Sequence, residues 1–186
     1  MPAYLASVRD LCLFRRGPED MPYSPRLLIA LLIAGGVLQV GFNLHDGVRP
    51  ALVAGSVLGS LAAIAAVFLL LRGRAKSERF VQTTMALAIV YLLFGIATSF
   101  LTLLLPMKEL REQLLSEPAH LPPLTGSQTL VMVAITALGI WQLCIWIGTL
   151  RRALDIPLAG GVLVFLMLVL VNLIVTSVVA SVIGVA

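Results

Sequence analysis

Uncharged polar side chains inside long apolar runs are the residues of this sequence best placed to do chemistry. Amide side chains both donate and accept hydrogen bonds, so they can bind a polar solute or bind one another between membrane helices. A polar cavity would use five of them, Gln39, Asn43, Gln82, Gln142 and Asn172. Gln39 and Asn43 are four positions apart and share one helix face. Cavity lining and interhelical hydrogen bonding are both open interpretations of this set.

Small residues recur at every fourth position of the second apolar run. Ala51, Gly55, Gly59 and Ala63 form this stripe, which contains a Gly-x-x-x-Gly unit. Another helix can approach such a face closely, because no bulky side chain stands in the way. The stripe therefore predicts either a helix-packing face within the chain or a docking face for another subunit.

Charged residues are missing from the middle of every apolar run, and only Arg26 lies at the start of one. Ionisable groups within a membrane mark ion paths, proton relays and acid–base sites, so their absence argues against these functions. The sequence also lacks the spacings typical of metal sites, nucleotide-binding loops and nucleophile elbows. We therefore expect a protein that is not an enzyme and has no cofactor and no metal site.

The composition requires that much of this chain faces lipid. Of its 186 residues, 60% are hydrophobic and 12% are charged, whereas soluble domains carry about 25% charged residues. A membrane-spanning helix needs about 20 apolar residues, and five runs qualify. The predicted spans are residues 25–44, 50–71, 80–105, 127–150 and 157–184. We predict an all-α polytopic membrane protein, with residues 25–186 forming a bundle of five transmembrane helices.

Basic residues gather in the segments on one side of the predicted spans. The tail and the alternate loops on its side hold ten of them, against three in the remaining loops. The positive-inside rule then places the N-terminus in the cytoplasm and the C-terminus in the periplasm, across an inner, cytoplasmic membrane of a bacterium. Topology also explains the basic pI of 9.6, so we expect no nucleic acid partner. The expected partners are the lipid bilayer and a membrane protein or a second copy of the chain.

Two segments outside the spans have helical patterns. In the tail, residues 1–24, an amphipathic face is predicted over Tyr4, Leu5, Val8, Leu11 and Cys12. This short helix can lie in the membrane interface or pack against the end of the bundle, and both interpretations are open. The pattern of residues 107–115, within the longest loop, predicts a second short amphipathic helix. Two roles are open for this loop, a contact surface for a partner and a cap on the bundle.

The segment Leu13–Pro22, directly before the first span, contains a Gly17-Pro18 dipeptide. This dipeptide and the layout of a cytoplasmic tail, five closely spaced spans and an outer C-terminus resemble the Yip1-like family of membrane proteins. The aromatic context usual in eukaryotic members is missing here. The resemblance implies a membrane-organising or accessory role, and it carries over no catalytic residues.

Two functions follow from these patterns. The first is a non-enzymatic accessory, scaffold or assembly subunit of a larger membrane complex, which fits the small-residue stripe and the low polar content of the spans. The alternative is a small transporter or channel with an uncharged polar cavity. The alternative requires that the five polar residues converge on one cavity near the middle of the membrane.

Overall fold

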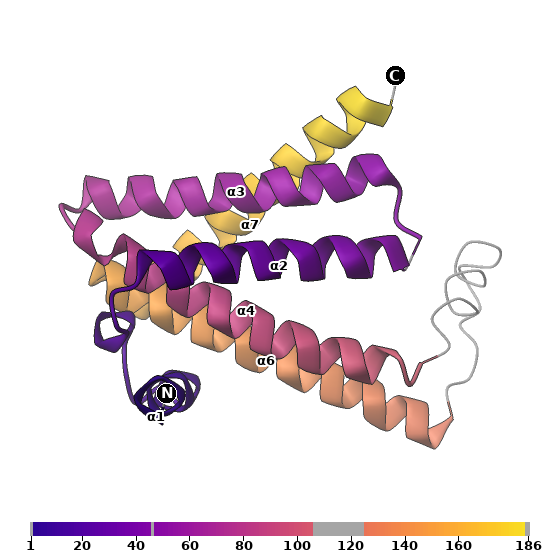
Figure 1. The fold of residues 1–186 in the computed structure, drawn as a ribbon, viewed down its shortest axis with the longest axis horizontal. Helices are drawn as coiled ribbons and strands as arrows, with labels where there is room; N and C mark the ends of the chain where they lie inside the picture. Colours follow the sequence, from indigo (N-terminus) through magenta and orange to yellow (C-terminus); the bar gives the residue numbers. More distant parts are fainter. Residues whose placement is uncertain (1, 46, 106–124, 185–186) are drawn as a thin grey trace. The chain divides into compact units, whose positions relative to one another are not determined.

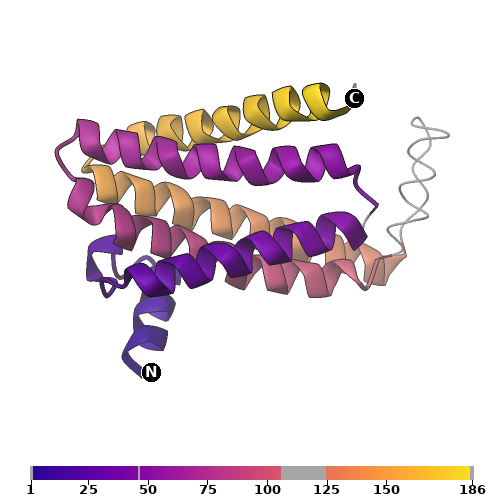
Figure 2. The same ribbon diagram turned by 45° about the horizontal axis from the view of Figure 1, so that its top comes forward.

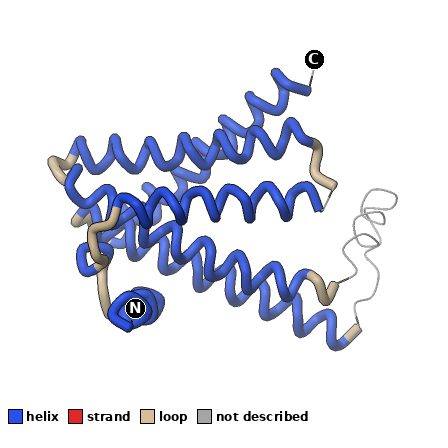
Figure 3. Tube along the Cα trace, viewed as in Figure 1, coloured by secondary structure: helices blue, strands red, loops and turns tan. Residues whose placement is uncertain are grey.

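The structure is a computed structural model, and it describes residues 2–45, 47–105 and 125–184. Within these ranges every regular element is helical, and no strand occurs (Figure 3). The elements, labelled in part in Figure 1, are α1 (Pro2–Cys12), η1 (Pro18–Asp20), α2 (Pro25–His45), α3 (Pro50–Gly73), η2 (Ser77–Arg79), α4 (Phe80–Thr102), α6 (Gly126–Leu154) and α7 (Leu158–Gly184).

Five of these helices are long and apolar enough to cross a membrane. They are α2, α3, α4, α6 and α7, and together with the short helix α1 they confirm the predicted all-α, five-span class. The short outer helix predicted over residues 107–115 lies outside the described residues.

The ends of two spans differ from the prediction. Helix α4 ends at Thr102, three residues before the predicted end at 105. A proline at position 106 has no N–H to donate to the carbonyl group four residues earlier, and it disfavours the α conformation at Leu105. Helix α6 continues to Leu154, past the predicted end at 150, and includes Arg151 and Arg152. Arginine is favoured in the last turn of a helix, where its charge complements the helix dipole and its head reaches water.

The chain divides into two compact units. The first unit contains α1, α2, α3, the beginning of α4, the end of α6, and α7, in residues 1–92 and 144–186. The second unit contains the remainder of α4 and α6, in residues 93–143. Within the second unit the rings of Phe94 and Trp141 pack edge to face, with their centroids 6.1 Å apart. This pair therefore links the two helix segments of the second unit.

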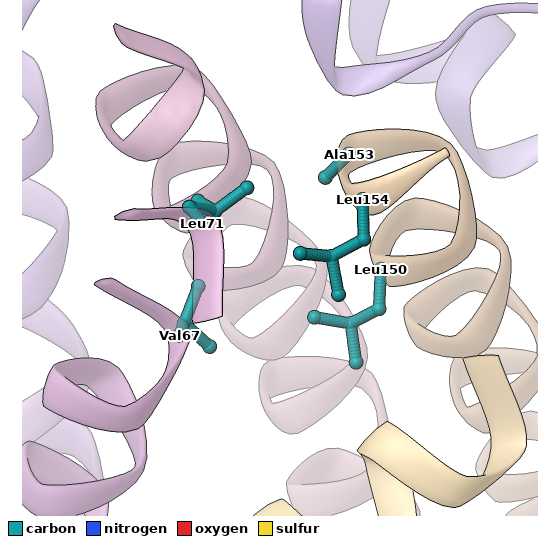
Figure 4. Close-up of a cluster of buried hydrophobic side chains, with 5 residues drawn as sticks. All are labelled: Val67, Leu71, Leu150, Ala153 and Leu154. Carbon is teal, nitrogen blue, oxygen red and sulfur yellow. The ribbon is translucent and has the colours of Figure 1, made fainter. Parts of the chain in front are cut away.

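In the first unit, α3 and α7 run antiparallel along each other (Figure 2). A separate apolar cluster joins the end of α3 to the end of α6. Its buried members are Val67, Leu71, Leu150, Ala153 and Leu154 (Figure 4). Partly buried side chains from α4 and α7 pack against this cluster, which is therefore the point where four helices of the unit meet.

Helix ends in this chain are capped by local side-chain and backbone hydrogen bonds. Ser24 Oγ accepts a hydrogen bond from the Leu27 amide at 3.3 Å, which satisfies a free donor in the first turn of α2. Thr125 and Gln128 form a reciprocal capping box at the start of α6. After α3 the chain turns through Ala75, whose φ of 55° lies in the left-handed region. Residues other than glycine are strained there.

Replacing Ala75 with glycine is expected to raise the free energy of unfolding by about 1 kcal/mol, because glycine adopts a positive φ without the clash of a Cβ atom. Thermal unfolding of the purified protein in detergent measures this change. Ala75→Ser is the control, because serine keeps a Cβ atom and should give no such gain. A loss of stability in Ala75→Gly would mean that the extra freedom of glycine in the unfolded chain outweighs the relief of strain.

Candidate functional site

The small-residue face of α3 packs against α7. A Cβ atom built on Gly55 would lie 2.6 Å from the carbonyl oxygen of Thr176. One built on Gly59 would lie 2.7 Å from the carbonyl oxygen of Asn172. Both glycines are buried, and the flanking members of the stripe, Ala51 and Ala63, are half-buried. Any larger residue at the two glycines would therefore push the two helix backbones apart.

Helix α7 of the same chain therefore covers the small-residue face of α3. The sequence had predicted this face to contact either a helix of the same chain or another subunit. Thr176 also donates a hydrogen bond from its Oγ1 to the Gly55 carbonyl oxygen at 3.2 Å. The close approach of the helices makes this bond available, because the glycine exposes its backbone carbonyl to the neighbouring side chain. We call Gly55, Gly59, Asn172 and Thr176 the α3–α7 seam.

A short chain of polar side chains crosses from α2 to α7 beside this seam. Asn172 Nδ2 donates to Ser60 Oγ at 3.5 Å. Ser60 Oγ in turn lies 3.5 Å from Gln39 Oε1 and 2.9 Å from the Ser56 carbonyl oxygen. Two of the five predicted cavity residues, Gln39 and Asn172, are thus connected through Ser60. Asn43 lies one turn further along α2 and is half-buried.

Gln82 lies apart from this chain of polar residues, at the beginning of α4. Its Nε2 donates to the carbonyl oxygen of Met21 at 2.7 Å and to that of Glu19 at 3.2 Å. Gln142 is half-buried and belongs to the second unit. The first unit therefore brings Gln39 and Asn172 together and places Gln82 at a different site, where it holds the segment that precedes α2.

That preceding segment is a packed part of the first unit. Gly17, Pro18 and Met21 are buried, and the Asp20 carboxylate accepts a hydrogen bond from the Gly17 amide at 3.1 Å. Sequence reasoning placed these residues in a tail and missed their packing. A signal was present in the apolar Pro18 and Met21 beside an acidic residue three positions after Gly17, the spacing that caps a helical turn.

Gln82→Ala is expected to loosen this segment and to lower the free energy of unfolding by about 1–3 kcal/mol, since it leaves backbone carbonyl groups without their donor. The rate of tryptic cleavage after Arg15 and Arg16 should rise, and gel analysis of limited proteolysis in detergent measures it. Gln142→Ala removes the same side chain in the second unit and should leave this rate unchanged. Equal cleavage in both variants would contradict the role given to Gln82.

The end of the first unit that carries α1 and the α3–α4 and α6–α7 connections is strongly basic. Residues 9–26, 72–79 and 151–155 together hold ten basic residues and five acidic ones. Two ion pairs link the connections, since Asp155 pairs with Lys76, and its Oδ1 lies 3.5 Å from Arg79 Nη1. Acidic partners are too few to neutralise the remaining arginines, so this end keeps an excess of positive charge.

The described residues hold no group of three or more His, Cys, Asp or Glu side chains able to bind a metal ion. Cys12 and Cys144 do not form a disulfide bond with each other. Burial raises the pKa of the Cys12 thiol above its ordinary value, so this group stays protonated at neutral pH and is a weak nucleophile.

The five apolar helices define this protein as an integral, multi-pass membrane protein. No family model, no curated protein and no solved structure matches the chain. No family match therefore supports the predicted resemblance to the Yip1-like family, and the structure supports only its layout of five apolar helices.

Proposed function

We propose that this protein is a non-enzymatic accessory or assembly subunit of a larger membrane complex. The observation that carries the proposal is the low burial of its last two spans. In an 18-residue apolar stretch of α6, and in one of α7, only 6% of the residues are buried within the chain. Long helix faces are therefore left to lipid or to the helices of another membrane protein.

Helix α6 offers the most suitable face for a partner helix. Leu130, Val133 and Ile140 are 60–72% exposed, and their spacing of three and seven positions places them along one face of the helix. This apolar face gives a partner helix a continuous contact area.

A photo-cross-linking residue at position 140 tests this proposal in native membranes. We expect a discrete adduct with one membrane protein, identified by mass spectrometry after purification in mild detergent. The same residue at position 150 is the control, because Leu150 is 2% exposed and faces the chain's own core. Adducts with lipid alone, together with a partner-free particle in the purification, would overturn the proposal.

A small transporter or channel is the second candidate, and the chain of Gln39, Ser60 and Asn172 favours it. If these groups bind a polar solute during transport, Asn172→Leu should abolish uptake into proteoliposomes while the protein still folds. If the three side chains instead serve helix packing, Asn172→Leu should lower the thermal stability and leave uptake into proteoliposomes unchanged. The position of Gln82, bonded to Met21, weighs against a single cavity built from all five residues.

We also propose an inner-membrane location with the basic end in the cytoplasm, which rests on the ten basic residues at this end against three elsewhere. Labelling of single cysteines by a membrane-impermeant reagent in intact cells tests the orientation. Position 15 should be protected in intact cells, and position 49 should react.

A further inference from the structure

A cavity of about 150 Å³ lies where the end of α6 meets α1 and the residues after it. Its polar lining includes Arg16, Arg151 and Arg152, and its apolar lining includes Leu11, Phe14 and Ile145. All of these residues belong to the first unit. The cavity has room for about five water molecules, at roughly 30 Å³ each, which is similar to the five heavy atoms of a phosphate group.

The cavity is electropositive. Three guanidinium groups line it, and none of its lining residues carries a carboxylate. Arg16 pairs with Asp10, with 3.3 Å between Arg16 Nε and Asp10 Oδ2, and Asp10 also pairs with Arg9. No ion pair of Arg151 or Arg152 occurs among the described residues, so at least two of the three lining charges have no counter-charge from this part of the chain.

Much of the cavity wall is held in place by the fold. Leu11 and Ile145 are buried, and Phe14 adopts the left-handed backbone conformation with a φ of 60°. Arg152 Nη2 donates to the Phe14 carbonyl oxygen at 2.8 Å and so fixes this strained turn. The Phe14 ring faces Gly148, where a Cβ atom would lie 3.7 Å from the ring. A guanidinium group has five N–H donors, so Arg152 keeps donors for a ligand while it holds the turn.

We propose that this cavity binds the phosphate group of an anionic phospholipid. Arginine matches phosphate oxygens through paired N–H donors and is less strongly hydrated than lysine, which suits a partly enclosed site. The cavity lies at the charged end of a membrane-spanning helix, the level at which basic pockets meet lipid headgroups. Its apolar side, formed by Leu11, Phe14 and Ile145, suits the glycerol and acyl portion of a lipid better than a free, fully hydrated phosphate ion.

Native mass spectrometry of the full chain in detergent, titrated with dioleoyl phosphatidylglycerol, tests the proposal. We expect one lipid to bind with an affinity at least about fivefold higher than that of dioleoyl phosphatidylcholine. Arg151→Gln should remove most of this preference, and Arg151→Lys should restore part of it, because the charge returns without the paired donors. Inorganic phosphate at millimolar concentration should not displace the lipid.

Matched variants separate the cavity from the general positive charge of this end. Arg15→Gln removes a charge from the same segment outside the cavity lining, and it should leave the preference intact. Gly148→Leu adds a side chain toward Phe14 and should block binding without any change of charge. Gly139→Leu, on the same helix and in open space, is its control and should bind lipid normally.

Three results would overturn the proposal. An equal loss of preference in Arg15→Gln and Arg151→Gln would assign the effect to diffuse surface charge. Normal lipid binding by a correctly folded Gly148→Leu variant would show that the lipid does not bind in the cavity. Displacement of the lipid by inorganic phosphate would identify the ligand as the free ion. Thermal unfolding of each variant, compared with the wild type, distinguishes a lost site from a lost fold.

Discussion

Replacing Leu71 with alanine is expected to lower the free energy of unfolding by about 2–5 kcal/mol. Leu71 is 1% exposed and contacts the cluster formed with Val67, Leu150, Ala153 and Leu154 at the ends of α3 and α6 (Figure 4). Truncation leaves a cavity that helices held on several sides cannot easily close. Thermal or chemical unfolding in detergent measures the loss.

Leu163→Ala is the control for this truncation. Leu163 lies on α7 and is 67% exposed, so its methyl groups face lipid or detergent and leave no internal cavity when they are removed. We expect this variant to stay within about 0.5 kcal/mol of the wild type. Equal effects of the two truncations would show that the cluster is not the point where these helices are held together.

The class of the fold could be predicted from the sequence because the bilayer imposes a strict requirement on length and polarity. A run such as 157–184, with no charged residue, has few alternatives to a membrane-spanning helix. The ends were less predictable. Helix α6 continues through Arg151 and Arg152 because these side chains can reach water from a helical backbone, a property that hydropathy alone does not show.

Which helices pair could not be read from the pattern. The spacing of Gly55 and Gly59 indicates that some helix can approach α3, and the partner, α7, lies more than one hundred residues further along the chain. Every span is apolar on most of its surface, so hydrophobic periodicity does not mark an inner face in a membrane as it does in water. For the same reason, the sequence pattern did not predict that the Gln82 side chain points toward the segment before α2.

The cavity at the basic end was also missed at the level of sequence. Arg16 and Arg151 are distant in the chain, and each alone is explained by membrane topology. At the turn with a positive φ at Phe14, the first segment meets the end of α6, where Arg152 donates a hydrogen bond to the Phe14 carbonyl oxygen. A left-handed phenylalanine has no sequence signature comparable to a glycine at that position, so the meeting of these arginines depends on the tertiary structure.

Gly59→Ala is expected to destabilise the protein by about 1–3 kcal/mol, because the added Cβ atom would lie 2.7 Å from the Asn172 carbonyl oxygen and 2.8 Å from Thr176 Oγ1. Thermal unfolding in detergent measures the change, and Gly41→Ala is the control. Gly41 lies on α2 with no atom in reach of a Cβ, so alanine there should be neutral or stabilise the helix by up to about 1 kcal/mol.

Gly55→Ala should show a loss similar to that of Gly59→Ala, since its Cβ atom would lie 2.6 Å from the Thr176 carbonyl oxygen. The double variant should lose less than the two single losses added together, because one separation of α3 from α7 relieves both clashes. Full additivity would mean that the two glycines act at independent contacts. Stability equal to that of Gly41→Ala would mean that α7 does not pack on this face. The face would then be free for the helix of another subunit, and the accessory function would gain a second docking surface.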